Sequence, residues 1–138
     1  MNLQEKEQQI IEEFAIFDDW LDKYSYIIEL GKELPLIDEK FKINENLIDG
    51  CQSRVWLAAE KKDGRLYFFA DSDAIISKGV ISMLIKVLSG ESPKNIASSD
   101  LSFLKEIGLQ EHLSPTRANG LAGMIQRIKE IALQNISL

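Results

Sequence analysis

A two-residue turn signal near the middle of the chain constrains its fold more than any other feature. Asp63-Gly64 separates two runs, residues 54–62 and 65–70, that contain aromatic, β-branched and other apolar side chains. An Asp-Gly pair favours the tight turn between antiparallel strands, because both turn positions adopt a positive φ. The sequence therefore predicts one antiparallel β-hairpin over these residues.

Helical patterns precede the hairpin. Residues 3–14 and 18–31 carry apolar side chains at helical spacing, with polar residues between them. Asp18 and Asp19 are suited to the start of the second helix, and Gly31 is suited to the position just after its end. The first third of the chain therefore predicts two helices, packed as a hairpin.

Helical patterns also follow the hairpin. Asp71-Ser72-Asp73 offers capping side chains for a third helix that is apolar on nearly all sides, so we expect it to be the most buried. Later starts are predicted at Ser92-Pro93, at Asp100 for a short helix that closes at Gly108, and at Ser114-Pro115. Helices around one hairpin indicate an α+β fold, with the helices on one face of a small antiparallel sheet. A chain of 138 residues is expected to form a single domain over 1–138.

Charge and composition exclude several classes of function. The net charge is −6, which lacks the basic footprint of most nucleic-acid-binding proteins. The polar N-terminus and the lack of a long apolar run predict a cytoplasmic protein with no membrane partner. One histidine and one cysteine make a zinc site unexpected, while carboxylate sites for Mg²⁺ or Ca²⁺ stay open by composition; no metal ligand is assigned in this chain.

Cys51 is the residue with the clearest chemical potential. It is the only cysteine, which excludes an internal disulfide or a CxxC motif. A lone cysteine is most often a small buried hydrophobe. Here Gly50 precedes it, Gln52, Ser53 and Arg54 follow it, and the segment lies where a loop enters a strand. These surroundings favour a thiol that meets a partner.

A reactive thiol acts as the thiolate, and at an ordinary pKa of about 8.5 only a few per cent is ionised near neutral pH. A nearby cation would therefore favour the thiolate by lowering the pKa of the thiol. Arg54 and Arg117 are the candidates by residue type, although Arg117 also fits the first turn of the last helix. Asp73 fits a helix cap, with a role toward a partner as the alternative.

The segment Asp49-Gly50-Cys51-Gln52-Ser53-Arg54-Val55-Trp56-Leu57 resembles the GCQSxVW signature of the SufE family, the partners of cysteine desulfurases. Four other segments agree in the family's order: Trp20 with Tyr24 to Gly31, Leu34-Pro35, Ser72 to Gly79 as SDAxIxKG, and His112 to Leu121 as HLSPxRxNGL. Leu36-Ile37-Asp38 departs from the second proline-containing pair that the family often shows there.

The resemblance implies a function and a fold. Cys51 would accept sulfur from the persulfide of a SufS-like, pyridoxal-phosphate-dependent desulfurase and relay it to a SufBCD-like scaffold for iron–sulfur cluster assembly. The pyridoxal phosphate stays on the partner, so this chain needs no cofactor. It would be a cosubstrate rather than an independent enzyme, and a monomer or weak homodimer. The implied fold is that of the IscU scaffolds, with one further strand beside the hairpin.

The resemblance also implies roles for particular residues. Gly50, Gln52, Ser53, Arg54 and Arg117 would support a partly buried Cys51. Two further residues, Asp73 and Asn119, are expected at the partner interface.

Three other functions stay open at this point. The protein could dock on a desulfurase and activate it without carrying sulfur, or it could belong to a paralogous branch that serves a different desulfurase. A cysteine hydrolase or peroxidase is the third, and it lacks a resolving cysteine; His112 has no identifiable orienting partner for a Cys–His pair.

Overall fold

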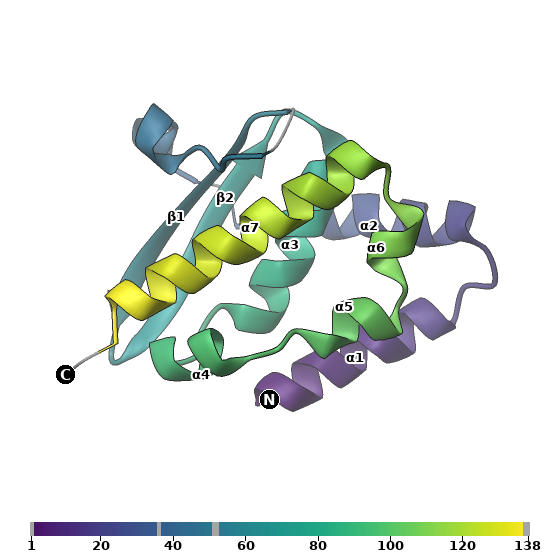
Figure 1. Ribbon diagram of the computed structural model, residues 1–138, viewed down its shortest axis with the longest axis horizontal. Helices are drawn as coiled ribbons and strands as arrows, with labels where there is room; N and C mark the ends of the chain where they lie inside the picture. Colours follow the sequence, from purple (N-terminus) through teal and green to yellow (C-terminus); the bar gives the residue numbers. More distant parts are fainter. Residues whose placement is uncertain (1, 36, 51–52, 137–138) are drawn as a thin grey trace.

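The computed structural model describes residues 2–35, 37–50 and 53–136. It is an α+β fold, as the sequence predicts, with helices packed on a two-stranded antiparallel sheet (Figure 1). The helices and strands are α1 (Leu3–Ala15), α2 (Trp20–Lys32), η1 (Glu39–Phe41), η2 (Asn44–Asn46), β1 (Val55–Lys62), β2 (Arg65–Ser72), α3 (Ile75–Leu88), α4 (Pro93–Ser98), α5 (Ser102–Glu106), α6 (Leu109–His112) and α7 (Pro115–Gln134).

The predicted hairpin is present. β1 and β2 pair from Val55 opposite Ser72 down to Lys62 opposite Arg65, and the turn residues Asp63 and Gly64 both have a positive φ. β2 runs two residues further than expected, which brings its end to the start of α3.

The one further strand expected beside the hairpin is not formed by the described residues. Single bridges, Leu47 with Trp56 and Leu66 with Glu91, stand in its place. The segment between α2 and β1 turns twice as the short 3₁₀ helices η1 and η2, which interrupt an extended backbone. Pro35 has no N–H group to donate to a neighbouring strand, so it bonds to β2 only through its carbonyl, which accepts the Ala70 N–H at 3.3 Å.

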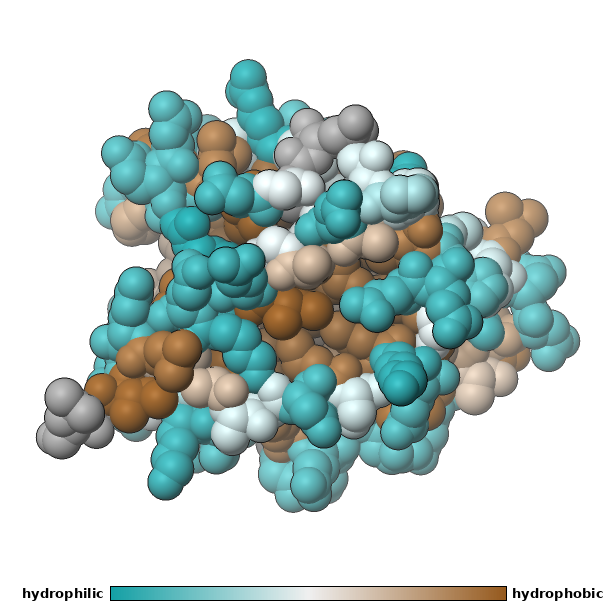
Figure 2. All heavy atoms as spheres, viewed as in Figure 1, coloured by the Kyte–Doolittle hydropathy of each residue, from teal (hydrophilic) through white to brown (hydrophobic). Residues whose placement is uncertain are grey.

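α3 is the centre of the core, and the prediction that it is the most buried helix is confirmed, since nine of its residues are buried. It contacts β2, α1, α2 and α7. On the face shown in Figure 2, polar side chains surround an apolar hollow. No helix in the described part of the chain is long and apolar enough to cross a membrane.

Gly31 does not end α2, contrary to expectation, but lies inside it against α3. A Cβ on Gly31 would stand 3.1 Å from the backbone nitrogen of Gly79, and a Cβ on Gly79 would stand 2.2 Å from the carbonyl oxygen of Ile27. The two helices therefore approach at a pair of glycines. The hydroxyl of Ser82 reinforces this contact by donating to the Leu30 carbonyl at 2.6 Å.

The predicted helix starts are confirmed at Ser92 and Ser114, whose hydroxyls accept the N–H groups of Asn95 and Arg117. Asp19 rather than Asp18 caps α2. The short helix after Asp100 closes at Glu106, before the predicted Gly108. Gly108, with φ 71°, starts the unpredicted helix α6.

Candidate functional site

The loop that contains the cysteine, residues 49–54, is called the thiol loop below. Its base is closed where the Ile48 N–H donates to the Val55 carbonyl at 2.9 Å, next to the bridge between Leu47 and Trp56. Ile48 and Val55 are both buried. Both ends of this six-residue segment are therefore anchored in the hydrophobic core.

A pair of hydrogen bonds joins the end of the thiol loop to Asp73, two residues before α3. The Arg54 N–H donates to the Asp73 carboxylate at 3.0 Å, and the Asp73 N–H donates to the Arg54 carbonyl at 3.2 Å. The expectation that Asp73 caps α3 is therefore wrong, because its carboxylate serves the loop. Ala74 holds the N-cap position and makes no side-chain capping bond.

The first half of the thiol loop lies on α7. Gly50 has φ 90°, and a Cβ there would stand 3.5 Å from the Asn119 carbonyl oxygen. One turn further along α7, a Cβ on Gly123 would stand 2.2 Å from the Asp49 carbonyl oxygen. Residues 119 and 123 share one helix face, so Asp49 and Gly50 lie close to the backbone of α7, where Gly123 has no side chain to keep the loop away.

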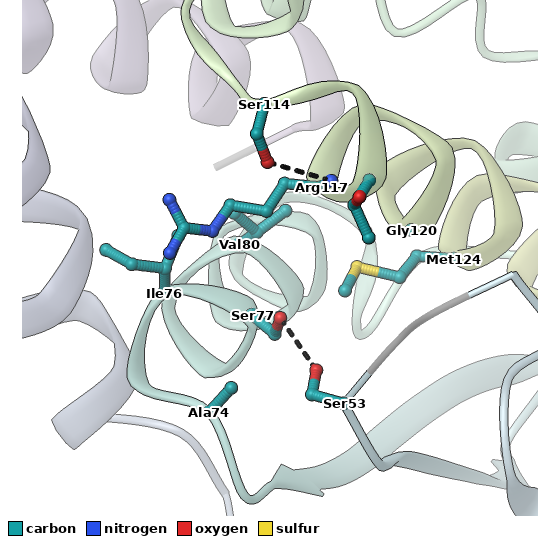
Figure 3. A pocket seen from close by; sticks show the side chains of 10 residues that line it. Ser53, Ala74, Ile76, Ser77, Val80, Ser114, Arg117, Gly120 and Met124 are labelled. Carbon is teal, nitrogen blue, oxygen red and sulfur yellow. Dashed lines mark hydrogen bonds between the residues drawn. The ribbon is translucent and has the colours of Figure 1, made fainter.

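A pocket of about 570 Å³ opens beside the thiol loop, between the first turns of α3 and α7 (Figure 3). The guanidinium of Arg117 extends from α7 toward Ile76 on α3, and the hydroxyls of Ser53 and Ser77 face each other at 3.1 Å. The lining residues are Ser53, Ala74, Ile76, Ser77, Val80, Ser114, Thr116, Arg117, Gly120 and Met124.

The pocket is suited to an anion. None of its described lining residues is acidic, although the whole chain carries a net charge of −6. The Arg117 guanidinium makes no ion pair or hydrogen bond with any other residue that the structure describes. The N-terminal ends of α3 and α7, which carry partial positive charge, both meet the pocket.

The predicted site residues divide into three groups. Ser53 and Arg117 line the pocket, whereas Arg54 and Asp73 are joined by two hydrogen bonds and Gly50 lies beside the Asn119 carbonyl. Arg54 is exposed and does not line the pocket. Cys51 and Gln52 lie outside the described residues, so the expected partial burial of Cys51 stays a prediction.

Most of the pocket lining, Ser77 included, and the loop contact at Gly123 were not expected from the sequence. Gly123 carries a usable signal, because glycine inside a helix costs about 1 kcal/mol relative to alanine and so suggests a close approach. Ser77 has no such signal. His112 stacks on Trp20, with ring centroids 4.0 Å apart, and does not line the pocket.

An ion-pair network fixes the segment before the thiol loop. Lys42 contacts Asp71 at 2.9 Å, and Lys78 contacts the same carboxylate at 3.5 Å. Hydrogen bonds to Asp71 and Glu39 raise the pKa of Lys42 to about 12. Burial pushes the pKa of Asp71 upward, but hydrogen bonds from Lys42 and the Ser72 N–H, with the lysine charges, bring it below its ordinary value.

No cluster of three or more histidine, cysteine, aspartate or glutamate side chains that would suit a metal occurs in residues 2–35, 37–50 and 53–136.

The family model described as SufE, Fe-S metabolism associated domain, matches residues 8–132. An uncharacterized SufE-like protein of Rhizobium meliloti (strain 1021) is 44% identical over 129 residues, which cover 90% of this chain and 92% of that protein. A second, from Rhizobium etli, is 41% identical over 129 residues, covering 90% of this chain and 87% of that protein. The solution structure of a hypothetical protein from Thermus thermophilus has a TM-score of 0.78 at 21% identity, covering 94% of this chain and 95% of that one, which shows a shared fold.

Proposed function

The chain belongs to the SufE family of Fe-S metabolism associated domains, and from this membership we propose that Cys51 accepts a sulfane sulfur from a cysteine desulfurase. The match over residues 8–132, which includes the Gly50-Cys51-Gln52-Ser53 segment, carries the proposal. The sulfur then passes to a scaffold on which iron–sulfur clusters are assembled. The desulfurase brings the pyridoxal phosphate, so this chain needs no cofactor of its own.

The transfer is a thiol–persulfide exchange. The Cys51 thiolate attacks the outer sulfur of the persulfide on the desulfurase, a new S–S bond forms, and the donor's own S–S bond breaks as its cysteine thiolate leaves. One sulfane sulfur changes carrier and no external oxidant or reductant is needed. Delivery repeats the exchange, with the scaffold thiolate as the attacking group.

The geometry around the thiol loop supports this chemistry. Both a thiolate and a persulfide anion are stabilised by positive potential, which the Arg117 guanidinium and the N-terminal ends of α3 and α7 supply beside the loop. The loop is held at both ends by Ile48, Val55 and Asp73, so the residues between are presented from a fixed base.

Intact-mass measurement tests the proposal directly. The protein is incubated with a SufS-like desulfurase and L-cysteine, and about 32 Da, the mass of one sulfur atom, should be added to the chain. Reductant should remove it, and Cys51→Ser should not acquire it. Because the chain has one cysteine, an adduct assigns the site without peptide mapping.

The same variant separates sulfur relay from docking without sulfur carriage. Sulfide release by the desulfurase, measured at physiological thiol concentration, should lose its stimulation when Cys51→Ser replaces the wild-type chain. If stimulation survives, the relay is rejected. Running the assay with a desulfurase of each paralogous branch identifies the partner, and absence of an adduct with both contradicts the proposal.

A further inference from the structure

The pocket between the first turns of α3 and α7 has two chemically different walls (Figure 3). Ile76, Val80 and Met124 form an apolar wall, and Val80 and Met124 are almost completely buried. Arg117 and Ser114 belong to a polar wall, from which the Arg117 side chain extends toward Ile76. An apolar surface with a small number of polar groups is typical of pockets that bind small organic molecules. A ligand that fits this pocket should have an apolar part and a polar part.

Arg117 determines what the polar part of such a ligand is. It is the only charged residue among the lining residues that the structure describes, and its guanidinium makes no hydrogen bond or ion pair with any described residue. An unpaired guanidinium offers its donors in a planar fork that matches the two oxygens of a carboxylate. The Arg117 side chain is exposed, so a ligand can reach it from solution without a change of fold.

Two other classes of charged ligand fit the pocket less well. A zwitterionic amino acid carries an ammonium group, for which the described lining residues offer no carboxylate. Sulfate and phosphate can pair with Arg117, but they leave the apolar wall in contact with water. A carboxylate with a short apolar body and no amine is the chemistry that uses both walls.

We propose that this pocket binds a small monocarboxylate with a short, branched apolar body. The carboxylate pairs with the Arg117 guanidinium, and the apolar body covers Val80 and Met124. Neither contact involves Cys51, so the site goes beyond the proposed sulfur transfer and does not depend on it.

An NMR titration of the full chain with isovalerate tests the proposal. Isovalerate has one carboxylate and an isobutyl body, and it replaces chloride at constant ionic strength near neutral pH. We expect saturable amide shifts in residues 74–77 and 114–120, which surround the pocket. The expected Kd is about 1 mM, which is within reach of a ligand of this size.

The Arg117→Gln variant removes the charge that should hold the carboxylate. We expect it to weaken the binding of isovalerate at least about tenfold, because a charge-assisted, two-pronged pair is lost. Arg65→Gln is the matched control, since it changes the net charge of the chain equally. Arg65 lies at the opposite end of the hairpin from the thiol loop and does not line the pocket. Its variant should bind isovalerate within about twofold of the wild-type Kd.

Three further probes separate the contributions of the ligand's parts. Isovaleramide keeps the shape and lacks the charge, and L-valine keeps the body and the carboxylate but adds an ammonium group. Each should bind at least about fivefold more weakly than isovalerate. Acetate keeps only the carboxylate and a methyl group, and its affinity should fall about fourfold for each apolar carbon that no longer covers the wall.

Several results would overturn the proposal. Isovalerate that gives no saturable shift up to about 50 mM means that the pocket does not take this class of ligand. Equal affinity for Arg117→Gln or for isovaleramide means that the carboxylate is not held by Arg117. Equal affinity for acetate and isovalerate means that only a loose attraction of anions is present.

Failure of this proposal is distinguishable from failure of sulfur transfer. The titration contains no desulfurase, so a chain that acquires no sulfur adduct can still bind isovalerate. Conversely, an adduct on a chain that does not bind isovalerate leaves sulfur transfer standing and removes the carboxylate site.

Discussion

Asp73 holds the end of the thiol loop through a single side-chain acceptor. Its carboxylate takes the Arg54 N–H, while its own N–H donates to the Arg54 carbonyl. Asp73→Ala removes the first bond and keeps the second. Because one hydrogen bond contributes about 1 kcal/mol, the Arg54 amide should exchange with solvent roughly fivefold faster in this variant.

Amide hydrogen exchange by NMR measures this effect. Asp73→Asn is the matched control, because its side-chain oxygen still accepts the bond, and it should exchange close to the wild-type rate. The Ile48 amide is the internal reference, since its partner is the Val55 carbonyl. Equal protection of Arg54 in the alanine and wild-type chains would contradict this assignment.

Local sequence could place Asp73 near the start of α3 but could not say which N–H group it serves. A cap and a loop contact are both within reach of that side chain, and the choice depends on Arg54, which is distant in sequence. The same limit applies to Ser53 and Ser77, whose pairing requires the thiol loop to meet α3.

At the scale of whole segments, the ion pairs of Asp71 make the attachment between β2 and the chain before the thiol loop depend on pH. The pKa of Asp71 is lowered in the folded protein, so between that value and the ordinary value of about 3.9 the unfolded chain binds more protons. The stabilisation is therefore complete above about pH 4 and is lost as the pH falls through the folded-state value.

Urea unfolding at a series of pH values measures this contribution. Asp71→Asn should cost about 1 kcal/mol near neutral pH, and the difference from wild type should shrink toward zero in acid. Lys42→Gln should reproduce part of the loss, because Lys42 contributes the shorter contact. A difference that stays constant from neutral to acid pH would show that the carboxylate charge is not responsible.

The hairpin and the helix starts at Ser92 and Ser114 were predictable, because turn and capping residues act on their immediate neighbours. Gly31 was misplaced because a glycine that ends a helix and one that lets two helices touch look alike in one sequence. Only the contact with Gly79, 48 positions away, separates them. The two 3₁₀ turns before the thiol loop lacked any periodic signal.

At the scale of the whole molecule, α3 contacts α1, α2, α7 and β2, so its closest contact should have a large effect on overall stability. A Cβ on Gly79 would stand 2.2 Å from the Ile27 carbonyl oxygen and 2.5 Å from the Ile27 side chain. The clashing atoms include the backbone of α2, and the backbones of two packed helices have little room to move apart. We expect Gly79→Ala to destabilise the protein by about 3 kcal/mol, although alanine is the better helix former.

Chemical denaturation gives the free energy of unfolding for this variant. Gly31→Ala is the graded control, because its Cβ would stand 3.1 Å from the Gly79 nitrogen and needs only a small shift. The expected order of loss is Gly79→Ala above Gly31→Ala. A stabilised Gly79→Ala protein would mean that α2 and α3 separate at little cost.

In the proposed sulfur transfer, the closed base of the thiol loop limits how far the sulfur on Cys51 can travel. Cys51 is three residues from Ile48 and four from Val55, both of which are fixed in the interior. Fully extended chain covers at most about 3.5 Å per residue, so the cysteine backbone cannot move beyond roughly 10 Å from that anchor. A donor cysteine at the bottom of a deeper crevice is out of range unless its own segment swings outward. In the proposed transfer, handover therefore depends on how closely the two protein surfaces meet, because the thiol loop is too short to act as a long swinging arm.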